Sequence, residues 1–339
     1  MPAEVDRLLS SLPVTTQVVR ARPDAAGPVR PWVMPGVMLG VTAAVLVVAG
    51  CTSVARGSSA PTKAAVPPST TVATIRPTTT TTAEEPGWTP VSLVNGAIAV
   101  DRRSSPQSTG DVITTFRFRV GLTRFNLHAG SSDPPTGAAM VAPDNGSTIG
   151  PHEAPLLLAA FNGGFKANAG VGGFELNGQV LVPLVPGAAS LVIDTSGAAR
   201  VGIWGQGVPV PGEQVASVRQ NLTTLVNAGR PSPRIADIGA WGSTVGGVAA
   251  VARSALGEDA AGNLIYSAGM QALPLDLTNA LVSAGATVAM QLDINPEWVQ
   301  LASAPAPGAP LAAGIPGQNR PADQYQVGWT RDFVTVLAP

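Results

Sequence analysis

The sequence predicts an α+β domain with a mixed, largely antiparallel β-sheet core and a few flanking helices, preceded by a membrane-targeting segment and a disordered linker. Short apolar runs separated by glycine-containing turns continue over residues 91–339, and they outnumber the segments with helical spacing. An uncharged apolar run near the N-terminus has the length of a membrane span. Between these two regions, a stretch rich in threonine and proline has no periodic hydrophobic residues from which to build a core.

The first 51 residues carry the features of a membrane-targeting segment. Residues 1–31 contain arginines and precede an apolar run at 32–51, which ends in Val-Ala-Gly-Cys at Cys51. The arginines predict a cytoplasmic N-terminus. Small residues before a lone cysteine resemble a bacterial lipoprotein signal, in which Cys51 would carry the lipid. An uncleaved single-pass transmembrane anchor is the alternative, and the long region before the apolar run favours it.

Both alternatives predict that the rest of the chain lies at the extracytoplasmic face of the cell membrane. Residues 52–90 are rich in Thr, Pro, Ser and Ala, which predicts an extended linker, either a bare spacer or an O-glycosylated one. The folded domain is expected to span residues 91–339.

Alternating or continuous apolar residues predict the strands of this domain. Residues 112–120 alternate around Phe116 and Phe118, which predicts a half-buried strand with Arg117 and Arg119 on its solvated face. The other predicted strands are 125–128, 156–161, 174–176, 179–182, 191–194, 199–204, 248–254, 263–267, 287–292 and 332–337. The Asn-Gly pair at 177–178 and the Ser-Gly pair at 196–197 predict hairpin turns, because these residues tolerate positive φ angles.

Two segments have helical spacing. Apolar residues three or four positions apart predict a helix over 215–225, which Gly229 would end. A second helix is predicted over 275–284, with Asp276 as its N-cap and Gly285 as its stop.

The composition excludes several classes of function. A net charge of −1 provides no basic field for nucleic acid. A single cysteine excludes an intramolecular disulfide and a cysteine-based metal site, and two histidines, His128 and His152, are too few for a histidine cluster. The chemistry must therefore rest on Asp, Glu, Asn, Arg and Lys side chains.

Three polar clusters interrupt or follow apolar runs in the second half of the chain. Residues 162–166 read Asn-Gly-Gly-Phe-Lys, Arg253 breaks the apolar segment 248–256, and Asp293 follows the segment 286–292. Ligand sites gather at strand ends, because the strand positions a side chain and the loop exposes it. The clusters together offer amide donors, a cationic clamp and one carboxylate.

The order of these motifs resembles the phosphodiester glycosidase family. The resemblance rests on Asn-Gly-Gly-Phe at 162–165, Arg-Ser-Ala-Leu-Gly at 253–257 with the strand Gly-Asn-Leu-Ile-Tyr at 262–266, and Gly-Ala-Thr-Val-Ala-Met-Gln-Leu-Asp at 285–293. It covers about residues 116–339. The family includes the uncovering enzyme domain, which removes N-acetylglucosamine from a sugar phosphodiester, and bacterial relatives described as exopolysaccharide proteins. Residues 219–221 and 241–244 resemble an actinobacterial envelope branch.

The resemblance implies a hydrolase that cleaves a sugar-1-phosphodiester in a cell-envelope or extracellular glycan. It implies Asp293, Arg253 and Asn162 as catalytic residues, and Lys166, Gly163, Gly164, Glu175 and Trp298 as substrate-binding residues. The chain departs from the family after Asp293, where Ile294 and Asn295 stand in place of the usual glycines. This difference leaves the substrate open.

The residues themselves fit this chemistry. A phosphate monoester is a weak base, so as a leaving group it needs charge neutralisation more than protonation. We therefore expect Asp293 to act at the anomeric carbon while Arg253, Lys166 and Asn162 hold the phosphate.

Each residue also has a structural explanation. Asp293 could cap a turn, Arg253 could form a buried salt bridge, and the glycines could simply serve a tight turn. Glu175 could be an exposed strand residue, and Trp298 could cover the core.

Two other functions stay open at this point. One is a non-catalytic envelope lipoprotein that binds a phosphorylated glycan, and the other is a scaffold lipoprotein without a small-molecule site. Carboxylate and amide oxygens also suit a divalent cation, although no spacing in the sequence demands a cofactor.

Overall fold

The computed structural model describes residues 85–107, 110–135, 145–242 and 247–339. The predicted targeting segment, Cys51 and most of the predicted linker lie outside these residues, so those predictions stay untested. No helix in the described part of the chain is long and apolar enough to cross a membrane. The first strand begins at Thr89, two residues before the expected start of the domain.

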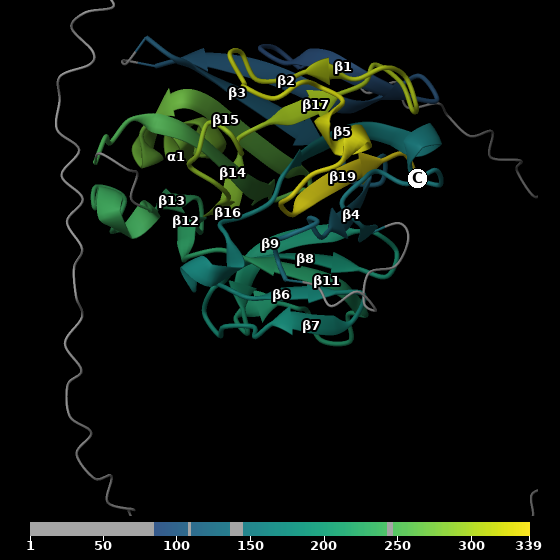
Figure 1. The fold of residues 1–339 in the computed structure, drawn as a ribbon. Coiled ribbons are helices and arrows are strands. Elements are labelled where there is room, and N and C mark those ends of the chain that lie inside the picture. The colour runs from purple at the N-terminus through teal and green to yellow at the C-terminus, as the bar shows by residue number, and fades with distance from the viewer. Residues whose placement is uncertain (1–84, 108–109, 136–144, 243–246) are drawn as a thin grey trace, which may run out of the picture. The chain divides into compact units, whose positions relative to one another are not determined.

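Three β-sheets make up the described domain (Figure 1). The largest has eight strands in the order β1 (Thr89–Val94), β2 (Ala97–Pro106), β3 (Val112–Phe118), β15 (Leu264–Ala272), β14 (Val251–Asp259), β16 (Ala286–Gln291), β12 (Thr224–Asn227) and β13 (Arg230–Pro231). Neighbouring strands within it are antiparallel.

The second sheet, drawn lowest in Figure 1, has six strands. Their order is β10 (Gly207–Val208), β9 (Ala199–Trp204), β8 (Ala189–Asp194), β11 (Val215–Gln220), β6 (Phe174–Leu176) and β7 (Gln179–Val182). Its β9–β10 pair is parallel, and its other pairs are antiparallel.

The third sheet has five strands and supplies two edges of the site described below. Its order is β18 (Ala312–Ala313), β17 (Leu301–Ser303), β5 (Leu157–Asn162), β19 (Phe333–Leu337) and β4 (Arg124–His128). All four pairs are antiparallel. Because β5 and β19 run in opposite directions, the end of β5 lies beside the start of β19, with Asn162 opposite Phe333.

Helices are few, so the domain is β-rich rather than a balanced α+β fold. The described helices are α1 (Pro274–Ser283), the four-residue α2 (Gln324–Val327), and short 3-10 turns at Ala154–Leu156, Ala167–Ala169 and Ile238–Trp241. Helix α1 confirms the predicted helix at 275–284. Asp276 lies in its first turn and accepts the backbone N–H of the N-cap residue Leu273 at 2.9 Å, so it is not itself the cap.

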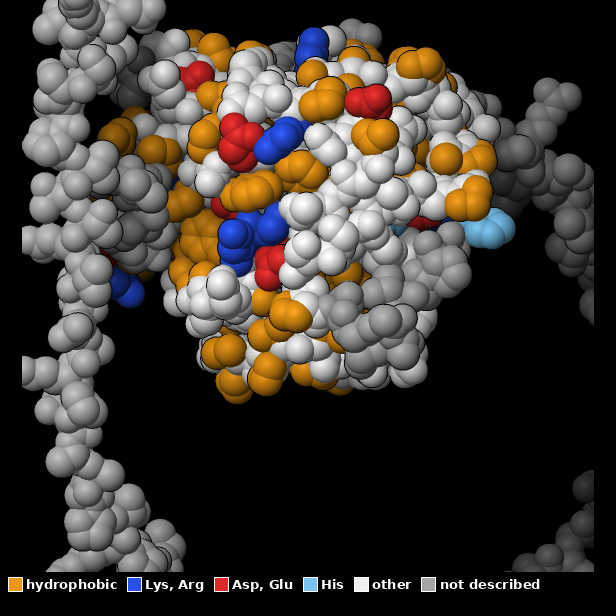
Figure 2. All heavy atoms as spheres, viewed as in Figure 1, with side chains coloured by type: hydrophobic (Ala, Val, Ile, Leu, Met, Phe, Trp, Pro, Cys, Tyr) orange, Lys and Arg blue, Asp and Glu red, His pale blue; other side chains and the backbone are white. Residues whose placement is uncertain are grey.

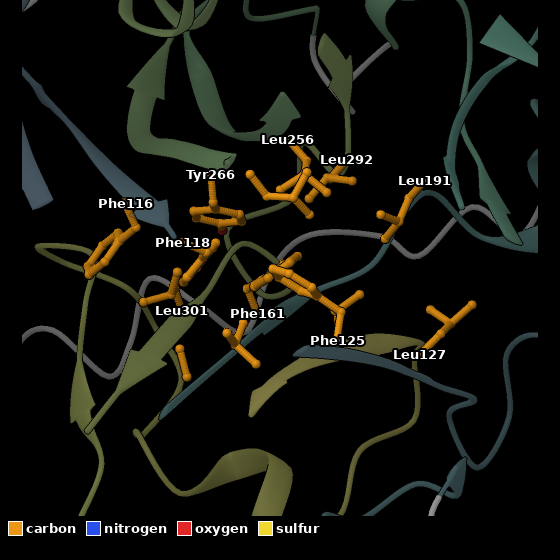
Figure 3. Close-up of a cluster of buried hydrophobic side chains, with 14 of the residues drawn as sticks. Phe116, Phe118, Phe125, Leu127, Phe161, Leu191, Leu256, Tyr266, Leu292 and Leu301 are labelled. Carbon is orange, nitrogen blue, oxygen red and sulfur yellow. The ribbon is translucent and has the colours of Figure 1, made fainter. Parts of the chain in front are cut away.

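The apolar core lies on both faces of the eight-stranded sheet. One face packs against α1 through Leu277 and Leu281. The other face joins the remaining sheets, and Figure 3 shows its aromatic centre. There the rings of Phe118 and Phe161 are stacked with centroids 5.7 Å apart, and Tyr266 lies 5.0 Å from Phe161. The alternation around Phe118 predicted its burial correctly.

The predicted helix over 215–225 is wrong. Residues 215–220 form β11, which pairs with β8 on one side and β6 on the other, and 224–227 form β12. Leu222 between them has a φ of 57°, which no α-helix contains. The last four residues of β11 are all buried, so both faces of this part of the strand are covered and its apolar residues need not alternate.

The predicted solvated face of β3 is also wrong. Arg117 is buried, and its guanidinium pairs with Asp101 at 2.8 Å and with Glu85 at 2.9 Å. Trp88 covers it, with the guanidinium carbon 4.0 Å from the ring centroid. Arg119 pairs with the same Asp101 at 2.7 Å. The residues before β1 therefore cover this face.

Most of the other predicted elements are present. Strands β6 and β7 have the predicted bounds, and the turn between them has φ angles of 52° at Asn177 and 74° at Gly178. Strand β14 begins and ends later than predicted, at 251–259 instead of 248–254. Strands β1, β2, β10, β13, β17 and β18 were not predicted, and β11 and β12 stand where the helix over 215–225 was predicted.

Candidate functional site

Asp293 is the buried carboxylate at the end of β16. Its side chain is fixed from its own loop, because Oδ1 accepts the backbone N–H groups of Ile294 at 2.7 Å and Asn295 at 3.3 Å. Only 4% of the residue is exposed. Burial raises the pKa of the Asp293 carboxyl to about 7, although the nearby Arg331 acts in the opposite direction. A carboxyl with a pKa near neutrality exchanges protons readily at pH 7.

Arg331, at the start of β19, is the cation that faces this carboxylate. Its Nη2 lies 3.3 Å from Asp293 Oδ2 and donates to the carbonyl of Gly164 at 2.8 Å. Its Nε lies 3.0 Å from Asp133 Oδ2, as an ion pair rather than a well-aligned hydrogen bond. Nη1 makes no hydrogen bond to a described residue. One guanidinium thus links two carboxylates and keeps a donor for a ligand.

Lys166 and Trp298 complete this side of the site. The Nζ of Lys166 lies 5.9 Å from the centroid of the Trp298 ring, and the guanidinium carbon of Arg331 lies 5.1 Å from it. Trp329 packs edge-on against Trp298, with centroids 5.5 Å apart. The indole therefore lies close to two cations and packs against the ring of Trp329.

These residues line a cavity of about 730 Å³, within the ~300–1,000 Å³ typical of ligand pockets. It is lined by Phe165, Lys166, Asn168, Ala169, Val171, Leu222, Gly239, Gly242, Asp293, Ile294, Asn295, Trp298 and Arg331. On the face of the molecule drawn in Figure 2, Lys and Arg side chains lie next to acidic and hydrophobic ones. The lining thus combines one carboxylate, two cations, two amides and apolar walls.

Asn162 does not reach the cavity. Its Nδ2 donates to Ser254 Oγ at 2.9 Å, and its Oδ1 accepts the hydroxyl of Tyr266 at 2.8 Å. Ser254 Oγ in turn accepts the backbone N–H of Asp293 at 3.2 Å. Asn162 therefore positions the Asp293 backbone through Ser254.

The two glycines of the Asn-Gly-Gly motif bind protein groups. The N–H of Gly163 donates to the carbonyl of Asp332 at 3.0 Å, and that of Gly164 to its Oδ2 at 3.1 Å. A Cβ on Gly163 would lie 1.8 Å from Asp332 Oδ2, and one on Gly164 would lie 2.8 Å from the Arg219 guanidinium. Their backbone thus packs against a buried ion pair, in which Arg219 Nε lies 2.7 Å from Asp332 Oδ2.

Arg253 also lies away from the cavity. It is fully buried, and its guanidinium donates to the carbonyls of Ala272 and Trp241, each at 3.0 Å, and to Gln291 Oε1 at 3.1 Å. Alternation along β14 places it on the same face as Ala255, which belongs to the cluster under α1. Burial lowers the pKa of Arg253 to about 10. Arg253 therefore holds the backbone of Trp241, which precedes the cavity-lining Gly242, and does not line the cavity itself.

Glu175 lies outside the cavity as well. It is on β6 of the six-stranded sheet, paired with Val218 of β11, and is partly buried. Burial raises the pKa of its carboxyl. Of the predicted site residues, Asp293, Lys166 and Trp298 therefore line the cavity together. Asn162, Arg253 and Glu175 do not line it.

Several residues of the site were missed or left open by the sequence reading. Arg331 and Asp133 were not singled out, and Arg219 was placed on a helix. Asn221 donates to the carbonyls of Gln291 and Leu292 at 2.7 and 2.8 Å and accepts the N–H of Phe165 at 3.2 Å, so it joins two loops of the cavity. An Arg-Asp pair directly before the last strand was the available signal for Arg331.

The donor set of the cavity does not fit a divalent cation. Its carboxylate is already paired with Arg331, and Lys166 adds a second positive charge. Among the described residues, no group of three or more His, Cys, Asp or Glu side chains is placed to hold a metal ion. The two cations instead favour an anionic ligand.

Comparisons with known proteins give a distant similarity. No protein-family model and no curated protein matches the sequence. The catalytic domain of zebrafish N-acetylglucosamine-1-phosphodiester alpha-N-acetylglucosaminidase, auto-inhibited by its pro-peptide, aligns over 74% of this chain and 87% of its own, with a TM-score of 0.45 and 12% identity. A hypothetical protein from Synechocystis aligns over 74% of this chain and 64% of its own, with a TM-score of 0.43 and 14% identity. These values do not assign the chain to a family.

Proposed function

We propose that the protein hydrolyses a sugar-1-phosphodiester of an extracellular or envelope glycan, and that the cavity around Asp293 is its active site. One observation carries the proposal: a buried carboxylate with a pKa near 7 faces a cavity that also presents Arg331 and Lys166. Groups with shifted pKa values in a cleft are candidates for acid–base chemistry. The two cations supply the charge neutralisation that a departing phosphate needs.

In the proposed reaction, the Asp293 carboxylate takes a proton from a water molecule. The water oxygen bonds to the anomeric carbon, and the bond between that carbon and the phosphate oxygen breaks. The electron pair leaves with the phosphate, which becomes a monoester dianion, and Asp293 then returns the proton to solvent. Because a single displacement by water inverts the anomeric carbon, the free sugar should have the opposite anomeric configuration.

Arg331 takes the role that the sequence reading gave to Arg253. Its Nη2 lies 3.3 Å from Asp293 Oδ2, so a phosphate bound at Nη1 would lie close to the carboxylate. Lys166 is exposed and lines the same cavity, so its Nζ can approach a second phosphate oxygen. Trp298 lies close to both cations and lines the same cavity, so it offers an aromatic surface to a sugar ring.

The test is incubation of the full chain with a panel of sugar-1-phosphodiesters of both anomeric configurations. Free sugar and phosphate monoester should appear in equal amounts for at least one member, and NMR of the fresh product should show inversion. Asp293→Asn should lose this activity and keep the wild-type melting temperature or exceed it.

Two outcomes would contradict the proposal. Equal turnover by Asp293→Asn would remove Asp293 from the reaction. Saturable binding of a panel member without any product would instead favour a non-catalytic binder of phosphorylated glycans.

A further inference from the structure

The guanidinium of Arg331 is divided between two carboxylates. Its Nε lies 3.0 Å from Asp133 Oδ2, and its Nη2 lies 3.3 Å from Asp293 Oδ2. Among the residues that the structure describes, no second nitrogen of Arg331 forms a hydrogen bond with either carboxylate. An arginine and a carboxylate ordinarily favour a two-point pair, in which two nitrogens meet both oxygens. Arg331 forms this pair with neither aspartate.

Two other buried arginines do form the two-point pair. Arg117 directs Nε to Asp101 Oδ1 at 3.0 Å and Nη2 to Asp101 Oδ2 at 2.8 Å. Arg219 directs Nε to Asp332 Oδ2 at 2.7 Å and Nη2 to Asp332 Oδ1 at 3.4 Å. Neither pair lines the cavity. The divided contact is therefore a feature of the cavity arginine, Arg331, and not of buried arginines in general.

Backbone contacts hold Asp133 beside this arginine. The N–H groups of Ser132 and Asp133 donate to the carbonyl of Thr330 at 3.2 and 3.1 Å. A Cβ on Gly130 would overlap the backbone of Thr330 and Arg331, so glycine permits the two segments to pack this closely. The carboxylate of Asp133 is therefore preorganised relative to the Arg331 guanidinium.

The same carboxylate also reaches the loop of the second cation. Asp133 Oδ1 accepts the N–H of Ala167 at 3.0 Å. Ala167 begins the 3-10 turn Ala167–Ala169, and the first N–H groups of a helical turn have no partner inside it. Lys166 directly precedes this turn. Asp133 thus caps the turn from a distant segment and fixes the backbone from which Lys166 extends.

The charge of Asp133 opposes any direct role in binding an anion. A carboxylate beside Arg331 and Lys166 repels a phosphate that approaches them. Its contacts instead explain what it contributes. Without this carboxylate, Nε of Arg331 would lose its charged partner, and nothing would oppose a two-point pair between Arg331 and Asp293. Such a pair would turn the guanidinium away from the ligand and neutralise the proposed base.

We propose that Asp133 is a positioning residue, which holds the Nε edge of Arg331 and the turn after Lys166 so that both cations face a bound phosphate. It thereby keeps Arg331 from closing onto Asp293. The inference rests on the proposed function, because that function assigns the phosphate to these two cations. It adds that a negative charge next to the phosphate site strengthens phosphate binding.

A binding experiment tests this role without any turnover. Methyl phosphate is titrated into the full chain by calorimetry, for the wild type and for Asp133→Asn. The asparagine oxygen can still accept the Ala167 N–H, but its NH₂ group then faces Nε of Arg331, so that donor meets donor. The affinity should fall about tenfold, which corresponds to one hydrogen bond of ordinary strength. Removal of a repelling charge alone would tighten binding, so equal or tighter binding would overturn the proposal.

A second background shows whether Asp133 acts by keeping Arg331 from Asp293. In Asp293→Asn, Arg331 has no carboxylate on which to close. Adding Asp133→Asn to this variant should therefore leave the affinity for methyl phosphate within about twofold, or raise it. A tenfold loss in both backgrounds would contradict the proposed role.

Asp101→Asn is the matched control. It removes the same charge from a buried arginine pair that does not line the cavity. It should lower the melting temperature and leave the affinity for methyl phosphate within about twofold. A loss equal to that of Asp133→Asn would assign the effect to stability or net charge and overturn the proposal.

Turnover separates this inference from the proposed function. With a diester that the wild type hydrolyses, Asp133→Asn should lower kcat at least about tenfold at pH 8, because Arg331 no longer faces the departing phosphate. Full activity of this variant would refute the positioning role and leave the proposed function standing. No hydrolysis by the wild type, together with the tenfold loss of methyl phosphate affinity in Asp133→Asn, would refute only the function.

Discussion

Arg253 and Arg331 are both buried near the end of β16, yet their surroundings differ. Arg253 donates to three backbone carbonyls and to the amide oxygen of Gln291, all of them part of the protein framework. Arg331 meets the carboxylates of Asp293 and Asp133, and its Nη1 makes no hydrogen bond to any residue that the structure describes. A buried arginine that donates only to neutral carbonyl and amide oxygens of the framework holds the fold. One that shares carboxylates at a cavity can take part in binding and chemistry.

The largest effect is expected from replacing Arg253, the arginine that holds the fold. Arg253→Gln should destabilise the domain by about 3–5 kcal/mol, because several buried acceptors lose their donor. Thermal unfolding should show a melting temperature lower by roughly 10 °C for a domain of this size. An unchanged melting temperature would show that Arg253 is not structural.

The next largest effect is expected from replacing Arg331, the arginine at the cavity. Arg331→Gln should lower kcat/KM about 100- to 1,000-fold, because the departing phosphate loses a preorganised charge. Arg331→Lys, measured in parallel, should recover part of this loss by restoring charge without the planar fork. A fall in melting temperature as large as that of Arg253→Gln, with activity per folded molecule unchanged, would contradict the distinction.

A smaller effect concerns Asp293 and pH. Its pKa is raised by burial to about 7, so its protonated form stabilises the fold fully below its unfolded pKa of about 3.9. This contribution is lost as pH rises through about 7. Asp293→Asn stays neutral, so its melting temperature should exceed that of the wild type by several degrees at pH 8. The advantage should shrink toward pH 4, and a pH-independent difference would contradict the burial of a charged group.

Lys166 should contribute less than Arg331, because its side chain is exposed and mobile charges at a rim are screened. Lys166→Met should weaken the binding of a phosphate monoester about tenfold, as measured by calorimetry at low and high salt. The loss should decrease as salt rises. Binding that is insensitive to both the substitution and the salt would exclude Lys166 from the anion site.

The smallest effect is expected at Glu175. This carboxylate is on β6, outside the cavity, so Glu175→Gln should change kcat/KM by less than twofold. A large loss of activity with an unchanged melting temperature would extend the site to the six-stranded sheet.

The sequence predicted the end of β16 as a site because an apolar strand followed by a carboxylate is a local pattern. It also predicted Lys166 and Trp298, which flank two such strand ends. Local pattern does not determine which face of a strand a residue occupies once both faces are buried. For this reason Arg253 and Asn162, both expected to hold phosphate, instead form hydrogen bonds to buried protein groups and do not line the cavity.

Arg331 could not be found by the same reasoning, because it precedes its strand. Only the antiparallel pairing of β19 with β5 places the start of one strand beside the end of the other. The helix predicted at 215–225 failed because both faces of the last four residues of β11 are buried, which removes the alternation that identifies a strand.

The most direct test of this account is a structure of Asp293→Asn bound to an uncleaved sugar-1-phosphodiester. The account predicts phosphate oxygens within hydrogen-bond distance of Arg331 Nη1 and Lys166 Nζ, with the anomeric carbon facing the side chain at position 293. A ligand bound elsewhere, or a phosphate held by groups other than these two cations, would contradict it.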